Sequence, residues 1–191
     1  METRTNNVPY PIAGILLIIS GALLILASLL AGGKVDIYTA ALVSSSMAFA
    51  VAMLRRKPCV SLCIATGLVT FVHILPILQL FELGEALMPN LIFRLLRLAG
   101  MAVLLAITIG LAQKKPMPKS PIIWMLPLLL FGAAWLASTV VTLVQSYQLA
   151  LATDAAWDIF LSAIAVFGHG FYVFAIGRHS LWLQSFDGAE E

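Results

Sequence analysis

Apolar and polar stretches alternate along the chain with a regular spacing. Six apolar stretches are each about as long as the 20 residues that a helix needs to cross roughly 30 Å of hydrocarbon. We expect them at residues 12–30, 37–54, 60–80, 91–111, 122–143 and 157–176. The pattern therefore predicts an all-α polytopic membrane protein with six transmembrane helices.

The composition supports this interpretation. Hydrophobic residues make up 61% of the chain and charged residues 10%, whereas roughly 25% of the residues in a soluble domain are charged. Arg4 is the only basic residue before the first span, and no small-residue cleavage site follows a short apolar core. We therefore expect a helix that is retained rather than a signal peptide that is removed. We expect one transmembrane domain over residues 1–191, with the lipid bilayer as a partner and no nucleic acid.

The distribution of basic residues predicts the orientation, because Lys and Arg accumulate in cytoplasmic loops. With the N-terminus inside, eight of the eleven basic residues fall on the cytoplasmic side: Arg4, Arg55, Arg56, Lys57, Lys114, Lys115, Lys119 and Arg178. Tryptophan and tyrosine suit aromatic belts at both boundaries, with Tyr147 and Trp157 outside and Tyr10, Trp124 and Trp182 inside. We therefore expect a protein of the cell inner membrane with both termini in the cytoplasm.

The spans also show weak internal similarity. The odd-numbered spans follow a proline, namely Pro11, Pro58 and Pro121, and the even-numbered spans open with "DIY" at 36, "LIF" at 91 and "DIF" at 158. One interpretation is three repeated helical hairpins of one orientation, at residues 10–57, 58–115 and 121–180. The alternative is that apolar helices resemble one another through their composition alone.

A chain of this length, with three hairpins and a first helix that reads "GILLIISGALLIL", resembles the small six-span bacterial acid-resistance membrane proteins of the HdeD type. The resemblance covers the architecture of the whole chain and includes no functional motif. This sequence departs from the pattern in the long polar excursion before the fourth span and in the charges within that span. The resemblance implies a stress-related membrane protein and assigns no site residues.

Two arginines interrupt the fourth span. Asn90, Arg94, Arg97 and Met101 are three or four residues apart, so they share one helix face. Arg94 lies about one turn inside the membrane and could extend along its own stem to the interface. Arg97 lies about two turns inside, where contact with lipid is unfavourable, so we expect it to face protein or water.

Three other spans carry polar stripes. The fifth span has Trp135, Ser138, Thr139, Thr142, Gln145 and Ser146 on one face of its outer half. The third has Thr66, Thr70 and His73, followed by Pro76, which should kink the helix. The sixth has Asp158, Ser162 and His169, and the glycines that flank His169 would allow a neighbouring helix or a ligand to approach closely.

These stripes lean toward the non-cytoplasmic half, which suggests a polar cavity open to that side. The candidate ligand-binding residues are Thr70, His73, Arg94, Arg97, Thr139, Thr142, Gln145, Asp158, Ser162 and His169. In this hypothesis the arginines supply positive charge and Asp158 a counter-charge. In the alternative, the hydroxyls are helix-packing contacts, and Glu82 and Glu85 fold back to neutralise the arginines.

Enzymatic and cofactor functions find little support. The chain lacks "HExxH" and "GxSxG", and no nucleophile with a positioned base can be named, so we expect no enzyme. Cys59 and Cys63 have no histidine or acidic neighbours, so no metal site is expected. Haem would need His73 and His169 as axial ligands, but we estimate their depths at about 22 Å and about 12 Å from the cytoplasmic ends of their spans. We therefore expect no cofactor.

Two functions remain after this elimination. The protein binds or transports a small polar molecule, or it is a non-catalytic structural, assembly or stress-response membrane protein. Either function allows other membrane subunits, or further copies in a homo-oligomer, as partners. One-sided polar stripes favour the first, because helix-packing contacts need not gather on one side of the membrane.

Overall fold

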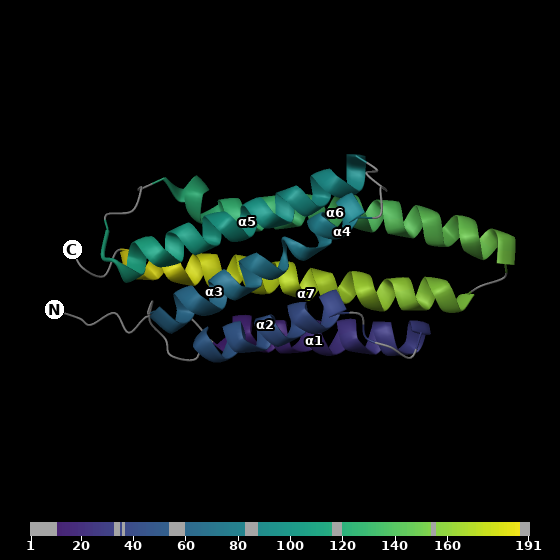
Figure 1. Cartoon of the computed structure of the whole chain (residues 1–191), viewed down its shortest axis with the longest axis horizontal. Coiled ribbons are helices and arrows are strands. Elements are labelled where there is room, and N and C mark those ends of the chain that lie inside the picture. Colours follow the sequence, from purple (N-terminus) through teal and green to yellow (C-terminus); the bar gives the residue numbers. More distant parts are fainter. Residues whose placement is uncertain are drawn as a thin grey trace.

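The computed structural model describes residues 11–32, 35, 37–53, 60–82, 88–115, 120–153 and 156–187, and within them it is helical without a strand. The helices are α1 (Pro11–Gly32), α2 (Ile37–Met53), α3 (Val60–Val72), α4 (Leu75–Glu82), α5 (Met88–Ala112), α6 (Pro121–Thr153) and α7 (Ala156–Asp187). They run along one long axis (Figure 1). We call the end where α1 begins and α7 ends the proximal end, and the opposite end the distal end.

Five segments of the described chain are long and apolar enough to cross a membrane. They are Ile12–Gly32, Val60–Leu78, Leu91–Ala112, Pro121–Gln145 and Ala156–Gln184. This confirms the prediction of an all-helical protein with apolar, membrane-compatible helices. The remaining predicted span, α2, is apolar but has only 17 residues, so it extends over about 26 Å, somewhat less than the hydrocarbon core.

The last two helices are longer than the apolar pattern predicts. The fifth and sixth spans were expected to end at residues 143 and 176, whereas α6 has 33 residues and α7 has 32. Each is therefore roughly 50 Å long, and their hairpin extends beyond the other helices at the distal end (Figure 1). Polar residues lower the hydropathy of a segment without ending its helix, so an apolar window underestimates helix length.

The helices pack in a closed ring. Helix α1 contacts α2, α2 contacts α3, α3 contacts α5, α5 contacts α6, α6 contacts α7, and α7 contacts α1 again. Helix α4 packs on α5, and α5 also reaches α7 across the ring. Consecutive helices thus lie side by side, as short connections favour. The hypothesis of three repeated hairpins stays a prediction.

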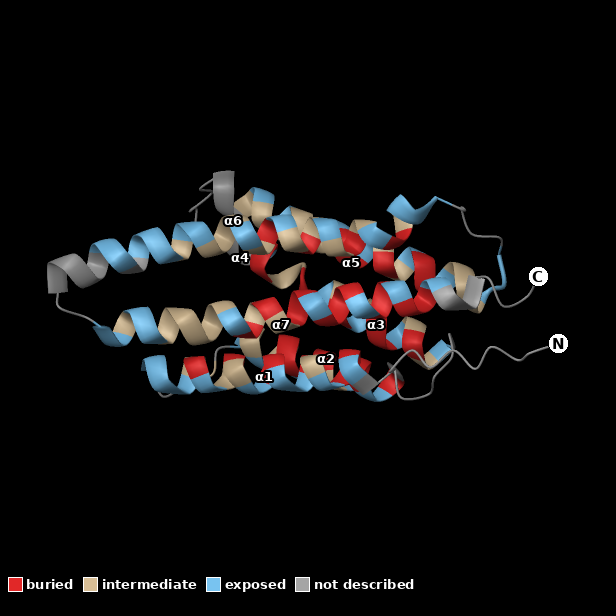
Figure 2. Ribbon diagram, turned by 180° about the vertical axis from the view of Figure 1, so that it is seen from behind, coloured by how far each residue is buried: buried red, intermediate tan, exposed pale blue. Residues whose placement is uncertain are grey.

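Burial is uneven along the bundle. Figure 2 shows buried residues in the proximal and central parts, whereas the distal parts of α6 and α7 are exposed or half-buried. Large apolar side chains cover much of the outside, with Phe71 61% exposed and Val51 65% exposed, as suits a surface in lipid. The belt assignment is wrong for Trp124 and Trp182, which are 2% and 7% exposed and belong to the core.

Candidate functional site

The site forms where the third apolar segment is broken. Helix α3 ends at Val72 and α4 begins at Leu75. Pro76 has no backbone N–H, so it cannot donate a helical hydrogen bond to Val72. The chain tightens before it: the N–H of Ile74 donates to the Phe71 carbonyl at 2.9 Å, a spacing of three residues. The kink predicted at Pro76 is confirmed.

Both arginines of α5 point into the protein. The guanidinium of Arg94 donates a hydrogen bond to the carbonyl of Pro76, which links α5 to the start of α4. Nη2 of Arg97 donates to Oγ of Ser138 in α6 at 3.1 Å. Both side chains are half-buried. Arg97 therefore faces protein, as its depth predicted, and Arg94 makes a protein contact too.

A cavity of about 140 Å³ lies beside these arginines. Its lining is Tyr38, His73, Pro76, Arg94 and Arg97. We call this space the arginine cavity. It combines two guanidinium groups, a phenol and an imidazole with the apolar ring of a proline. In the part of the chain that the structure describes, no carboxylate lines it.

A second, smaller space continues from the same residues toward the middle of the ring. Its volume is about 10 Å³, room for roughly one water molecule. Its lining is Tyr38, Leu42, His73, Arg97, Phe131, Trp135, His169, Tyr172 and Val173. The two spaces share Tyr38, His73 and Arg97, so only these side chains separate the arginine cavity from the space that His169 lines.

A backbone hydrogen bond and two aromatic rings hold His73 in position. Its Nδ1 atom lies 2.8 Å from the carbonyl of Val69, and a carbonyl only accepts, so Nδ1 carries a proton. The ring is 5.6 Å from Phe131 in an edge-to-face arrangement and 5.9 Å from Tyr172. With Nδ1 committed to the backbone, Nε2 of the neutral ring remains an acceptor.

The lining residues lie in one layer across the bundle. Arg97 precedes the proximal end of α5, at Ala112, by 15 residues, and His73 follows the proximal start of α3, at Val60, by 13 residues. At 1.5 Å per residue, Arg97 lies about 22 Å and His73 about 20 Å from the proximal end. The same count from Gln184, where the apolar part of α7 ends, puts His169 at about 22 Å.

This common depth corrects the argument used against haem. His169 was counted from an expected span end at residue 176, but α7 continues to Asp187, which removes the supposed offset from His73. Both histidines line the smaller space. That space holds about one water molecule and leaves no room for a macrocycle between the rings. The absence of a cofactor stays a prediction.

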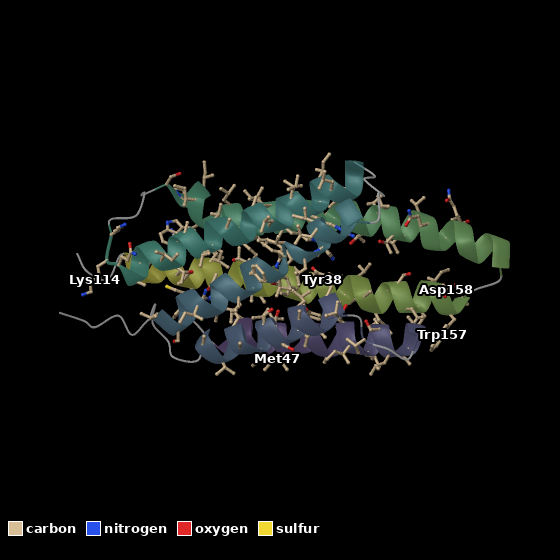
Figure 3. The ribbon with its side chains drawn as sticks, in the orientation of Figure 1. Tyr38, Met47, Lys114, Trp157 and Asp158 are labelled. Atoms are coloured by element: carbon tan, nitrogen blue, oxygen red, sulfur yellow. The ribbon has the colours of Figure 1, made fainter. Side chains whose placement is uncertain are left out.

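The other candidate residues lie away from the cavity. Asp158 precedes His169 by 11 residues along α7, a distance of about 16 Å, and Figure 3 shows Asp158 toward the distal end and Tyr38 near the centre. Ser162 of α7 is half-buried and lies between these two levels. Asp158 is therefore not a counter-charge at the cavity.

The hydroxyl and amide candidates of α3 and α6 are also separate from the lining. Thr70 donates from Oγ1 to the carbonyl of Thr66 at 2.8 Å, a bond within its own helix. Thr139 and Thr142 are half-buried, and Gln145 is exposed. The sequence pattern found the correct helix face but extended the site too far toward the distal end.

Two tyrosines were missed. Tyr172 follows His169 by three residues, so it lies on the same helix face, and this spacing could have identified it. Tyr38 is in the first turn of α2 and gave no such signal. The glycines beside His169 fit the expected close approach: a Cβ at Gly168 would lie 3.2 Å from Leu24 of α1.

The described residues contain no cluster of three or more histidine, cysteine or acidic side chains that could hold a metal ion. Searches against protein-family models, curated proteins and solved structures give no match to the chain. The functional argument therefore depends on the arrangement of this chain's own residues.

Proposed function

We propose that the protein is an integral membrane protein that binds or transports a small polar molecule, with the arginine cavity as the binding site. The observation that carries this proposal is the pairing of Arg94 and Arg97 with Tyr38 and His73 around a space of about 140 Å³. Ionisable side chains within apolar spans are unfavourable in lipid and usually mark a ligand or ion pathway. A pocket with a few convergent polar groups is the usual form of a small-molecule site.

In this proposal the proximal end is cytoplasmic, α2 also crosses the membrane and brings the number of spans to six, and the protein lies in the cell inner membrane. The distribution of Lys and Arg supports the orientation. Entry from the non-cytoplasmic side is supported by the lining of the cavity, which includes Tyr38 in the first turn of α2 and Arg94 in the distal half of α5.

Cysteine labelling in whole cells tests the orientation. Lys114 and Trp157 lie at opposite ends of the bundle (Figure 3), and both are exposed. In a chain with Cys59 and Cys63 replaced by serine, Trp157→Cys should react with a membrane-impermeant maleimide. Lys114→Cys should react only after the cells are permeabilised. The reverse pattern would refute the orientation.

A second candidate function is structural, with the arginines serving to hold helices together. Its support is that each guanidinium already bonds to a neighbouring helix, Arg94 to Pro76 and Arg97 to Ser138. Such contacts contribute about 0.6 kcal/mol each on average between membrane helices. This function predicts a lower melting temperature or oligomer content on loss of Arg97, and no ligand.

Native mass spectrometry of the detergent-purified protein separates the two functions. A ligand-binding protein should carry a reproducible non-covalent adduct that disappears in Arg97→Ala, while the variant keeps its helical circular dichroism. A structural protein should show no adduct in either form and a changed subunit number in the variant. The second result would overturn the binding proposal.

A further inference from the structure

The charges around the arginine cavity identify the class of ligand. Two guanidinium groups line it, and no carboxylate of the described residues does. The nearest described acid on α7, Asp158, lies about 16 Å from the level of His169. The fixed charge of the described lining is therefore positive.

Most N–H groups of the two arginines make no hydrogen bond to the described protein residues. A guanidinium carries five N–H groups. Among the described residues, Arg97 donates to Ser138 and Arg94 donates to the Pro76 carbonyl. Both acceptors are neutral, so they orient the guanidinium groups without balancing their charge. The remaining N–H groups are available to a ligand or to water.

Two cations beside one cavity in a low-dielectric layer repel each other, and this repulsion is relieved when an anion lies between them. The planar fork of arginine matches the two oxygens of a carboxylate or phosphate. The other lining groups suit the apolar part of such a ligand: Tyr38 contributes an aromatic face and Pro76 an apolar ring. The cavity volume of about 140 Å³ limits the bound group to a small one.

On this basis, and resting on the proposed function, we propose that the arginine cavity binds a small oxyanion, held between Arg94 and Arg97. The oxyanion belongs either to a free carboxylate or phosphate, or to the phosphate of a lipid headgroup. A cation is repelled by both arginines. A neutral molecule would bind less tightly, because hydrogen bonds to an ionised acceptor are stronger than those to a neutral one.

The test measures the melting temperature of the detergent-purified protein at constant ionic strength, with acetate, inorganic phosphate, ethanol or ethylammonium as the probe. At saturation acetate or phosphate should raise it by about 3 °C or more. Ethanol and ethylammonium should leave it unchanged. Stabilisation by ethylammonium or ethanol, without stabilisation by either anion, would overturn the oxyanion assignment and leave the proposed function in place.

Two arginine variants separate guanidinium recognition from charge alone. Arg97→Gln should weaken anion binding at least roughly tenfold, the loss expected when one charge-assisted hydrogen bond is removed. Arg97→Lys keeps the charge and loses the fork, so it should also bind several-fold more weakly. Competition among probes on the unmodified protein needs no variant, so the assignment can be tested even if a variant fails to fold.

Nanodiscs distinguish the two sources of the oxyanion. If a lipid supplies it, native mass spectrometry of protein from phosphatidylglycerol nanodiscs should show one retained lipid that acetate displaces and Arg97→Gln loses. If the oxyanion is free, acetate or phosphate should stabilise the protein equally in nanodiscs of neutral lipid. No response to acetate, phosphate or phosphatidylglycerol would overturn the inference, and the absence of any adduct would also overturn the proposed function.

Discussion

The guanidinium of Arg97 in α5 donates a hydrogen bond to the hydroxyl of Ser138 in α6, with 3.1 Å between Nη2 and Oγ. The same hydroxyl donates to the carbonyl of Trp135, one turn earlier in α6, at 3.0 Å. The serine oxygen that receives Arg97 is thus itself oriented by the backbone. A single neutral side chain therefore holds a charged group at the wall of the cavity.

Replacement of this serine tests that relationship. Ser138→Ala removes the acceptor for Arg97, so the guanidinium loses its fixed orientation, and we expect anion affinity to fall several-fold. The free energy of unfolding should fall by about 1 kcal/mol or less, as for other interhelical hydrogen bonds in membranes. Titration with acetate and thermal unfolding measure the two effects. Thr139→Ala, at the adjacent half-buried position, is the control and should change neither; an equal loss in both variants would contradict the role of Ser138.

The sequence predicted the helices better than their ends. Length and hydropathy determine where a chain can cross lipid, and five segments meet that criterion in the structure. The apolar pattern does not record where a helix leaves the membrane, so the continuation of α7 to Asp187 was missed. That error then shifted the expected depth of His169.

Side-chain spacing predicted the site only in part. Residues three or four apart share a face, which correctly directed Arg97, His73 and His169 toward neighbouring helices. Spacing on one helix does not give depth relative to another helix, so Asp158 was assigned to the same site as His169, although about 16 Å of α7 separates the two residues. No sequence pattern within α2 marks Tyr38. It joins the cavity lining because α2 packs against α3 in the folded protein.

Replacement of Pro76 should stabilise the protein and weaken ligand binding. In Pro76→Ala the new N–H can donate to Val72, so α3 and α4 can join into one helix, and we expect the free energy of unfolding to rise by about 1 kcal/mol or more. The carbonyl that binds Arg94 would move with the repaired backbone, so acetate binding should weaken roughly tenfold. Thermal unfolding and acetate titration measure both changes.

Pro127, inside α6, provides the matched control for that variant. It does not line the arginine cavity, so Pro127→Ala should affect stability while acetate affinity stays the same. If Pro76→Ala binds acetate as tightly as the unmodified protein, the helix break has no part in the site.

Gly100 of α5 packs directly against the side chain of Phe131 in α6. A Cβ at this position would lie 2.7 Å from Cδ2 of Phe131, a ring that packs on His73. Gly100→Ala should displace Phe131 toward His73 and lower the free energy of unfolding by about 1–3 kcal/mol, as overpacking does. Gly132→Ala, where no atom lies within 4 Å of the added Cβ, should be neutral or stabilising by up to about 1 kcal/mol. Thermal unfolding of the two variants should therefore give shifts of opposite sign or very different size.

His179 in the proximal half of α7 is a buried polar group outside the site. It is fully buried between Phe49, 4.9 Å away edge-on, and Trp182, 5.5 Å away in a stack. Neither ring nitrogen has a hydrogen-bond partner in the described part of the chain. An unpartnered buried polar group costs about 1–3 kcal/mol, so His179→Phe should stabilise the protein and raise the melting temperature by at least about 2–4 °C, the shift that corresponds to about 1 kcal/mol in a chain of this length.

The same substitution at His73 should have the opposite effect, because His73 donates from Nδ1 to the Val69 carbonyl. His73→Phe should lower the melting temperature and weaken acetate binding, whereas His179→Phe should leave acetate binding unchanged. Both variants keep an aromatic ring of similar size, so the comparison isolates the ring nitrogens. Destabilisation by His179→Phe would mean that its nitrogens bind an ordered water or another polar group, and the proximal half of the bundle would then contain a second hydrated site.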